Sequence, residues 1–123
     1  MPFDRPDSLA CMVLGAGAGR RLRPFTAAVP KPLLTILDRP NLDHMLDRIW
    51  ALGDIPVFLN LHHAADVLDR HLAALNCPRL FWRREPELTG PAGALRLFAE
   101  ELTRFETILV LSGDVIFADP LDR

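Results

Sequence analysis

Leu9-Ala-Cys-Met-Val-Leu14 is a continuous apolar run that leads directly into Gly15-Ala-Gly17-Ala-Gly19. A short apolar run that ends in glycines is typical of a strand buried on both faces of a parallel sheet. Cys11 lies inside the run, where a buried, reduced thiol is the usual state. This stretch therefore predicts the first, central strand of an α/β fold.

Further strands and helices alternate along the rest of the chain. The apolar spacing predicts strands over residues 55–60, 79–82 and 107–111, and helices over residues 41–53, 64–75 and 91–104. Asn41 is placed to cap the first helix and Gly53 to end it. Parallel strands require crossovers, so this alternation predicts a mainly parallel sheet with helices on both faces. We expect one domain over residues 1–123, with residues 1–8 flexible.

The charge balance and hydropathy limit the possible partners. The formal net charge is −2, with 14 basic and 16 acidic residues, whereas a nucleic-acid-binding domain has a basic excess. No apolar run approaches the roughly 18 residues that cross a bilayer. The proline-broken start from Met1 to Ser8 does not resemble a signal peptide. We therefore expect a cytoplasmic protein that binds neither nucleic acid nor a membrane.

The glycine-rich turn after the first strand is a candidate phosphate site. Ligands of parallel sheets bind beyond the carboxyl ends of the strands, and glycines let a backbone approach phosphate oxygens closely. Arg20, Arg21 and Arg23 follow and could supply positive charge. An ordinary strand-to-helix turn explains the glycines equally well. The turn lacks the Gly-Lys-Ser/Thr of a P-loop, and Arg20 stands where the dinucleotide pattern needs its third glycine.

Lys31 and Asp114 are two further candidates for ligand binding. Lys31 lies between Pro30 and Pro32, which stiffen the backbone on both sides and can aim a lysine at one target, although a solvent-exposed lysine would look the same. Asp114 follows the last predicted strand and would face the glycine turn.

His62 and His63 have no third ligand at suitable spacing, so a structural role is favoured over a metal site.

The motifs together resemble the signature of the sugar-1-phosphate nucleotidyltransferases. The matching segments are Leu14 to Thr26, Pro30-Lys31-Pro32, Asn60 to His63, Gly90 to Leu95 and Ser112 to Val115, in the family's order and spacing. Gly90-Pro-Ala-Gly93 is similar to the base loop of mannose-1-phosphate guanylyltransferases. The resemblance implies a Rossmann-like three-layer α/β sandwich. It also implies a reaction of a nucleoside triphosphate, GTP by this loop, with a sugar 1-phosphate.

The resemblance also implies residue roles. Arg21 would hold the β- and γ-phosphates, Lys31 would bind the α-phosphate or the sugar phosphate, and Asp114 would ligate Mg²⁺. The nucleotide would contact the glycine turn and the base loop, through Leu14, Gly15, Ala16, Gly17, Gly90 and Gly93.

The sequence departs from the family in three ways. Arg20 replaces a small hydroxyl residue, and Pro91 replaces a threonine and removes an amide donor. Family catalytic domains are also longer, and their second half supplies another metal-binding aspartate and most of the sugar pocket. We therefore expect a truncated domain with an uncovered sheet edge, which turns over poorly alone and self-associates or needs a missing C-terminal half.

Two alternative functions remain open. A catalytically incomplete module of the same fold would bind a nucleotide sugar in a regulatory or assembly role. A dinucleotide oxidoreductase would share the fold, but Arg20 and the Lys31 element disfavour it.

Overall fold

The computed structural model describes residues 9–16 and 29–115 of the 123-residue chain. The expectation that residues 1–8 are flexible falls outside this range. Four parallel strands form one sheet in the order β5-β4-β1-β6, with bounds β1 Leu9–Leu14, β4 Val57–Leu61, β5 Leu80–Arg84 and β6 Thr107–Ser112. Four helices cover it: α1 Asn41–Trp50, α2 Ala65–Leu75, α3 Gly90–Leu97 and α4 Ala99–Leu102.

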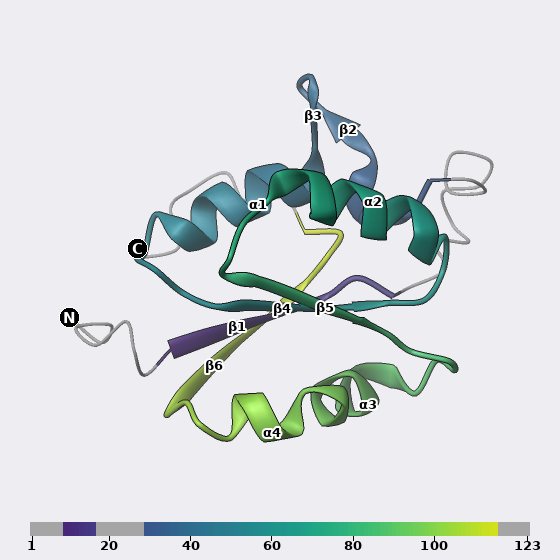
Figure 1. The fold of residues 1–123 in the computed structure, drawn as a ribbon. Helices are drawn as coiled ribbons and strands as arrows, with labels where there is room; N and C mark the ends of the chain where they lie inside the picture. The colour runs from purple at the N-terminus through teal and green to yellow at the C-terminus, as the bar shows by residue number, and fades with distance from the viewer. Residues whose placement is uncertain (1–8, 17–28, 116–123) are drawn as a thin grey trace.

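The helices lie on both faces of the sheet, so the predicted three-layer α/β architecture is confirmed. Helices α1 and α2 cover one face, and α3 and α4 cover the other (Figure 1). The chain runs from β1 outward to β4 and β5, and then returns to place β6 on the free side of β1. The direction of winding therefore reverses between β1 and β6, which makes the carboxyl ends of these two strands the topological switch point.

Strand β1 separates two apolar cores. Its side chains alternate between the faces of the sheet, as in any strand. Cys11 and Val13 join the core beneath α1 and α2, whereas Ala10 and Met12 join the core beneath α3 and α4. All four side chains are fully buried, which confirms the predicted central strand and the buried state of Cys11.

Helix α1 differs from its prediction at both ends. Asn41 does not cap the helix: it is the first helical residue, Pro40 takes the cap position, and the Asn41 side chain donates instead to the Val115 carbonyl at 3.1 Å. The helix ends at Trp50, and Gly53 lies in the following turn with φ of +139°. A tertiary hydrogen bond thus replaces the expected local cap.

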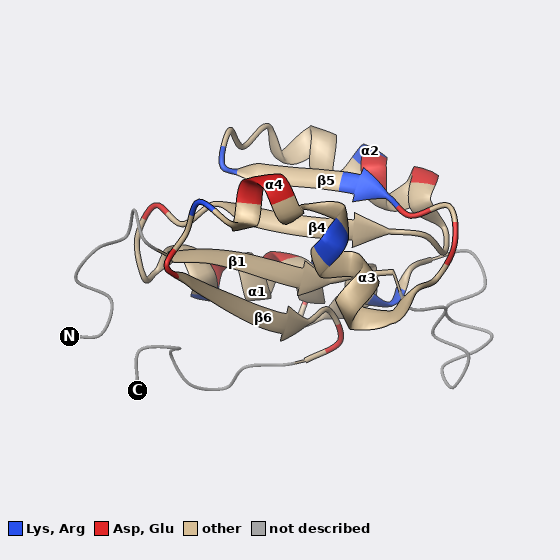
Figure 2. Cartoon of the chain, turned by 90° about the horizontal axis from the view of Figure 1, so that it is seen from below, with Lys and Arg blue, Asp and Glu red and all other residues tan. Residues whose placement is uncertain are grey.

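The helix predicted over residues 91–104 is interrupted at Phe98. This residue leaves helical geometry, with φ of −116° and ψ of 22°, and separates α3 from α4. The break leaves the Leu97 carbonyl to accept from Arg83 Nη1 at 2.8 Å, while the Arg83 guanidinium lies 4.9 Å from the Phe98 ring. Arg83 also pairs with Glu101, and Figure 2 shows the basic end of β5 and the acidic turn of α4 that this pair joins.

A small hairpin precedes α1 and is not predicted by the sequence. It consists of β2 (Thr35–Ile36) and β3 (Arg39–Pro40), which pair antiparallel. Its two connecting residues, Leu37 and Asp38, have positive φ values of 49° and 73°. Hairpin turns of this type usually carry Asn-Gly or Asp-Gly, and that signal is absent here.

Strands β5 and β6 form the two edges of the described sheet. Val110 of β6 is 43% exposed, so this edge carries some apolar surface. Whether that surface leads to self-association stays a prediction. In the part of the chain that the structure describes, no helix has the length and apolar character to cross a membrane.

Candidate nucleotide-phosphate site

The carboxyl ends of β1 and β6 bring Gly15 and Asp114 together. Leu14 is in register with Ser112, and the Gly113 N–H donates to the Leu14 carbonyl at 2.9 Å. A Cβ on Gly113 would lie only 2.7 Å from that carbonyl oxygen and 3.1 Å from Pro32 Cγ. Glycine is therefore required here for the close approach of the two strand ends and the proline segment.

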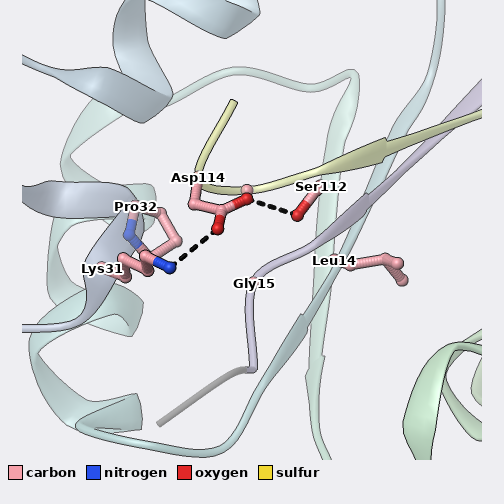
Figure 3. A pocket seen from close by; sticks show the side chains of 7 residues that line it. Leu14, Gly15, Lys31, Pro32, Ser112 and Asp114 are labelled. Carbon is pink, nitrogen blue, oxygen red and sulfur yellow. Dashed lines mark hydrogen bonds and ion pairs between the residues drawn. The ribbon is translucent and has the colours of Figure 1, made fainter. Parts of the chain in front are cut away.

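Lys31 points directly at Asp114. Pro30 is extended, with φ of −65° and ψ of 147°, and starts a 3₁₀ turn over Lys31–Leu33. This turn places Lys31 Nζ 2.7 Å from Asp114 Oδ2 (Figure 3). The structure thus brings together the residues predicted to bind phosphate and metal, with both side chains partly exposed.

Ser112 supports the same carboxylate from the other side. Its hydroxyl donates to Asp114 Oδ1 at 2.5 Å (Figure 3). The Lys31 ammonium, followed by the Ser112 hydroxyl, holds the pKa of Asp114 below its ordinary value of 3.8. Asp114 is therefore kept as an anion that already has two partners.

Two cavities meet at the ends of β1 and β6. The smaller, of about 100 Å³, is lined by Gly15, Lys31, Asp114 and their neighbours. The larger, of about 320 Å³, extends toward the start of α3 and is lined by Ala16, Asn60, Glu85, Gly90 and Pro91, among others. Leu14 and Ser112 line both cavities, so an elongated ligand could occupy the two together.

The residues of the predicted base loop form the start of α3. Gly90 has φ of +76°, a conformation that favours glycine. A Cβ on Gly93 would lie 1.6 Å from Thr89 Oγ1, so this position also requires glycine while Thr89 keeps its place. Gly90 lines the larger cavity, but Gly93 does not; it lines a neighbouring surface depression with Thr89 and Glu85.

A buried polar network behind the glycine turn is a part of the site that sequence reasoning missed. The Gly15 N–H donates to Asn60 Oδ1 at 2.9 Å, and Asn60 Nδ2 donates to Glu85 Oε2 at 2.9 Å. Thr89 Oγ1 then donates to Glu85 Oε1 at 3.2 Å. The available signal was Asn60, a polar side chain in the otherwise apolar strand β4, whereas Glu85 follows the charged pair Arg83-Arg84 and carries no such signal.

The structure describes only some of the remaining residues that were predicted to form the site. Gly17 and Arg21 lie outside the described residues, as does Arg20, so their roles stay predictions. His62 Nδ1 donates to the Glu85 carbonyl at 2.9 Å, which gives this histidine a structural contact at the end of β4. Within residues 9–16 and 29–115, no cluster of three or more His, Cys, Asp or Glu side chains could hold a metal ion.

A parallel sheet whose switch point presents a glycine turn, a lysine and a carboxylate defines an α/β protein suited to a phosphorylated ligand. The family named Nucleotidyl transferase has a sequence model that matches residues 10–123, and the chain belongs to this family. The resemblance noted in the sequence is confirmed at the level of the family.

The relatives include sugar-phosphate enzymes. The chain is 34% identical over 118 residues to the mannose-1-phosphate guanylyltransferase catalytic subunit beta of Danio rerio, covering 93% of this chain and 33% of that protein. It is 43% identical over 63 residues to the N-acetylmuramate alpha-1-phosphate uridylyltransferase of Caulobacter vibrioides, covering 51% of this chain and 26% of that one. The chain spans about a third or less of the length of these curated relatives.

Solved structures share the fold. A CTP:phosphocholine cytidylyltransferase from Streptococcus pneumoniae superimposes with a TM-score of 0.77 at 20% identity, over 93% of this chain and 48% of that one. A putative glucose-1-phosphate thymidylyltransferase from Bacillus anthracis gives a TM-score of 0.73 at 24% identity, over 92% and 47% of the two chains. These similarities confirm the Rossmann-like architecture.

Proposed function

We propose that this chain is the triphosphate-binding part of a sugar-1-phosphate nucleotidyltransferase. The observation that carries the proposal is the contact of Lys31 with Asp114 beside Gly15, at the switch point of the sheet. Relatives named as mannose-1-phosphate guanylyltransferases support GTP as the triphosphate and a sugar 1-phosphate as the second substrate.

The reaction requires positioning and charge neutralisation more than a protein nucleophile. An oxygen of the sugar phosphate forms a bond to the α-phosphorus of the triphosphate, and the bond to the leaving pyrophosphate breaks. Two anions that repel each other must be held in line while negative charge moves to the leaving group. The Lys31 ammonium lies at the edge of the smaller cavity, where it can bind a phosphate oxygen once it leaves Asp114. Arg21 is proposed to hold the departing phosphates.

Asp114 is proposed to ligate Mg²⁺. The Asp114 carboxylate and the Ser112 hydroxyl are oxygen donors of the kind that Mg²⁺ prefers. Mg²⁺ commonly uses one or two carboxylates together with substrate phosphates, so a single aspartate fits a metal–triphosphate complex. When bound, the ion would neutralise charge on the phosphates.

The larger cavity is proposed to hold the nucleoside, against Leu14, Ala16 and Gly90. The Gly15 N–H is already donated to Asn60, so Gly15 would contribute close backbone packing and not an amide contact. Gly93 would act indirectly, by leaving room for the Thr89 side chain behind that cavity. Gly17 is proposed to contact the nucleotide through its backbone.

Pyrophosphate release tests this function. The chain is assayed with each common nucleoside triphosphate and with mannose 1-phosphate or glucose 1-phosphate, and GTP binding is measured by calorimetry. Asp114→Asn, Lys31→Met and Arg21→Ala should each lower turnover by roughly 100-fold or more. Arg39→Met and Asp47→Asn are matched controls, because they break an exposed ion pair of 2.6 Å that lines neither cavity. Undiminished turnover in the site variants, or a wild-type chain that binds no triphosphate, would refute the proposal.

A binding module without catalysis is the second candidate. Pro91, which has no N–H, lines the larger cavity, and the described residues offer one carboxylate rather than a metal cluster. This version predicts binding of a nucleotide sugar that is largely independent of Mg²⁺, with no pyrophosphate release. Calorimetry with GDP-mannose, with and without Mg²⁺, separates the two candidates.

A further inference from the structure

We propose that Asn60 and Glu85 act as a clamp that fixes the backbone of Gly15 and ties this residue to the start of α3. They are positioning residues, and their effect on nucleotide binding rests on the function proposed above. The clamp joins the ends of β1, β4 and β5 to Thr89, just before α3, through three consecutive hydrogen bonds. These four segments surround the larger cavity.

The burial of the clamp makes its hydrogen bonds obligatory. Asn60 is 4% exposed and Glu85 is 6% exposed, so both side chains are withdrawn from solvent. A buried polar side chain that loses its partner is strongly disfavoured. Each polar group of the clamp therefore depends on the next, and displacement of one disturbs the others.

The two hydrogen-bond partners of Asn60, the Gly15 amide and the Glu85 carboxylate, determine the orientation of its side-chain amide. A backbone N–H only donates, so the Gly15 amide requires the Asn60 oxygen. A carboxylate only accepts, so Glu85 requires the Asn60 nitrogen. Glu85 thus selects the one orientation of Asn60 that can hold Gly15.

Packing constrains Gly15 and Thr89 as well. A Cβ on Gly15 would lie 2.9 Å from Leu59 Cδ1 and 3.1 Å from the Asn60 carbonyl oxygen, so Gly15 lies directly against β4. At the other end, the Thr89 hydroxyl occupies the space that a Cβ on Gly93 would need. Both glycine-containing segments of the site are therefore held to one buried network.

Reversing the polarity of the clamp provides the test. Asn60→Asp places a second carboxylate against Glu85, where the two repel each other. Adding Glu85→Gln supplies a donor that faces the new aspartate, whose other oxygen can again accept from Gly15. At pH 8, Asn60→Asp should lower the exchange protection of the Gly15 amide by roughly tenfold. The double variant should restore protection to within about threefold of the wild-type chain.

The affinity for GTP should follow the same order, weakened roughly tenfold by Asn60→Asp and recovered in the double variant. Asp47→Asn shows how a change of one charge at an exposed position, away from both cavities, affects the affinity for GTP. Equal affinities in the single and double variants, with protection changed as expected, would overturn the positioning role. A merely structural role predicts that GTP affinity tracks the melting temperature and not the protection of Gly15.

The wild-type chain gives a direct check that needs no variant. A scalar coupling across the hydrogen bond, from the Gly15 nitrogen to the side-chain carbonyl carbon of Asn60, should be detectable by NMR. Absence of this coupling together with an unprotected Gly15 amide would overturn the clamp. These measurements contain no nucleotide, so a failure of the clamp is distinguishable from a wild-type chain that binds no triphosphate.

Discussion

Lys31 Nζ and Asp114 Oδ2 lie 2.7 Å apart, although 83 positions separate the two residues in the sequence. The proposed phosphate-binding cation and the proposed metal ligand thus satisfy each other before any ligand is present. Binding of a metal–triphosphate complex would separate them, because the metal needs the carboxylate and the phosphate attracts the ammonium. The 3₁₀ turn supplies Lys31, Asp114 follows β6, and the hydroxyl of Ser112, the last residue of β6, holds the Asp114 carboxylate.

Lys31→Met should raise the pKa of Asp114 toward its ordinary value of 3.8. The folded chain holds this pKa low, so the associated stability is complete above pH of about 3.8 and is lost as the pH falls through the lowered folded value. Removing Lys31 should therefore flatten the acid dependence of unfolding in that window. Titration of the Asp114 carboxyl carbon by NMR checks this, with Arg39→Met as the control. The same midpoint in Lys31→Met and wild type would contradict it.

Lys31→Met should also tighten the binding of a divalent cation to the ligand-free chain. The lysine competes with the cation for Asp114, and an exposed ion pair is worth at most about 1 kcal/mol. The gain in Mn²⁺ affinity should accordingly be a few-fold, measured by electron paramagnetic resonance. Arg39→Met should leave the affinity unchanged. Weaker Mn²⁺ binding in Lys31→Met would show that the lysine does not compete.

Gly113→Ala should destabilise the chain by roughly 1–3 kcal/mol, because its Cβ would overlap the Leu14 carbonyl and press on Pro32. Gly90→Ala is a useful comparison. It meets open space and should cost only about 1 kcal/mol, for its positive φ. Urea unfolding measures both free energies. A Gly113→Ala variant as stable as the wild-type chain would contradict the close approach of the strand ends.

Cys11 should resist thiol reagents in the native state, because burial raises the pKa of its thiol to about 12. Cys77 is only partly buried and should react first. In a Cys77→Ser variant, labelling of Cys11 by a thiol reagent should therefore require unfolding. Rapid labelling of that variant without denaturant would show that β1 is more accessible than the structure indicates.

The hairpin turn should tolerate a stabilising replacement. Leu37 is 86% exposed, and both Leu37 and Asp38 have positive φ values. Replacing them by Asn and Gly, which suit such a turn, should raise the free energy of unfolding by about 1 kcal/mol. Thermal unfolding measures the gain. A loss of stability would mean that the Leu37 side chain stabilises the fold despite its exposure.

The strands of the parallel sheet were predictable because each contains an apolar run. The local departures have tertiary causes: Asn41 is recruited by Val115, and Phe98 interrupts its helix where Arg83 takes up the Leu97 carbonyl. The hairpin at Leu37 lacks the Asn-Gly or Asp-Gly pair from which such a turn is usually predicted. The spacing of apolar residues alone does not predict these tertiary contacts or the hairpin.

The sequence marks candidate site residues one by one, but it does not predict how they contact one another. The switch-point rule places Asp114 near the glycine turn, and the proline pair marks Lys31. Their direct contact depends on how the 3₁₀ turn packs against β6. Glu85 was missed because one acidic residue after a strand resembles a solvent-exposed side chain, and only burial distinguishes it.

The pairing of β1 with β6 also has a consequence for folding. The first and last strands of the described sheet are neighbours, with Leu14 opposite Ser112. Closing so long a loop is entropically costly and slow, so a local nucleus such as β4-α2-β5 should form earlier. During synthesis on the ribosome, the Lys31–Asp114 contact would then form after the contacts within β4, α2 and β5. Until β6 emerges, the central strand β1 would remain unpaired along one side.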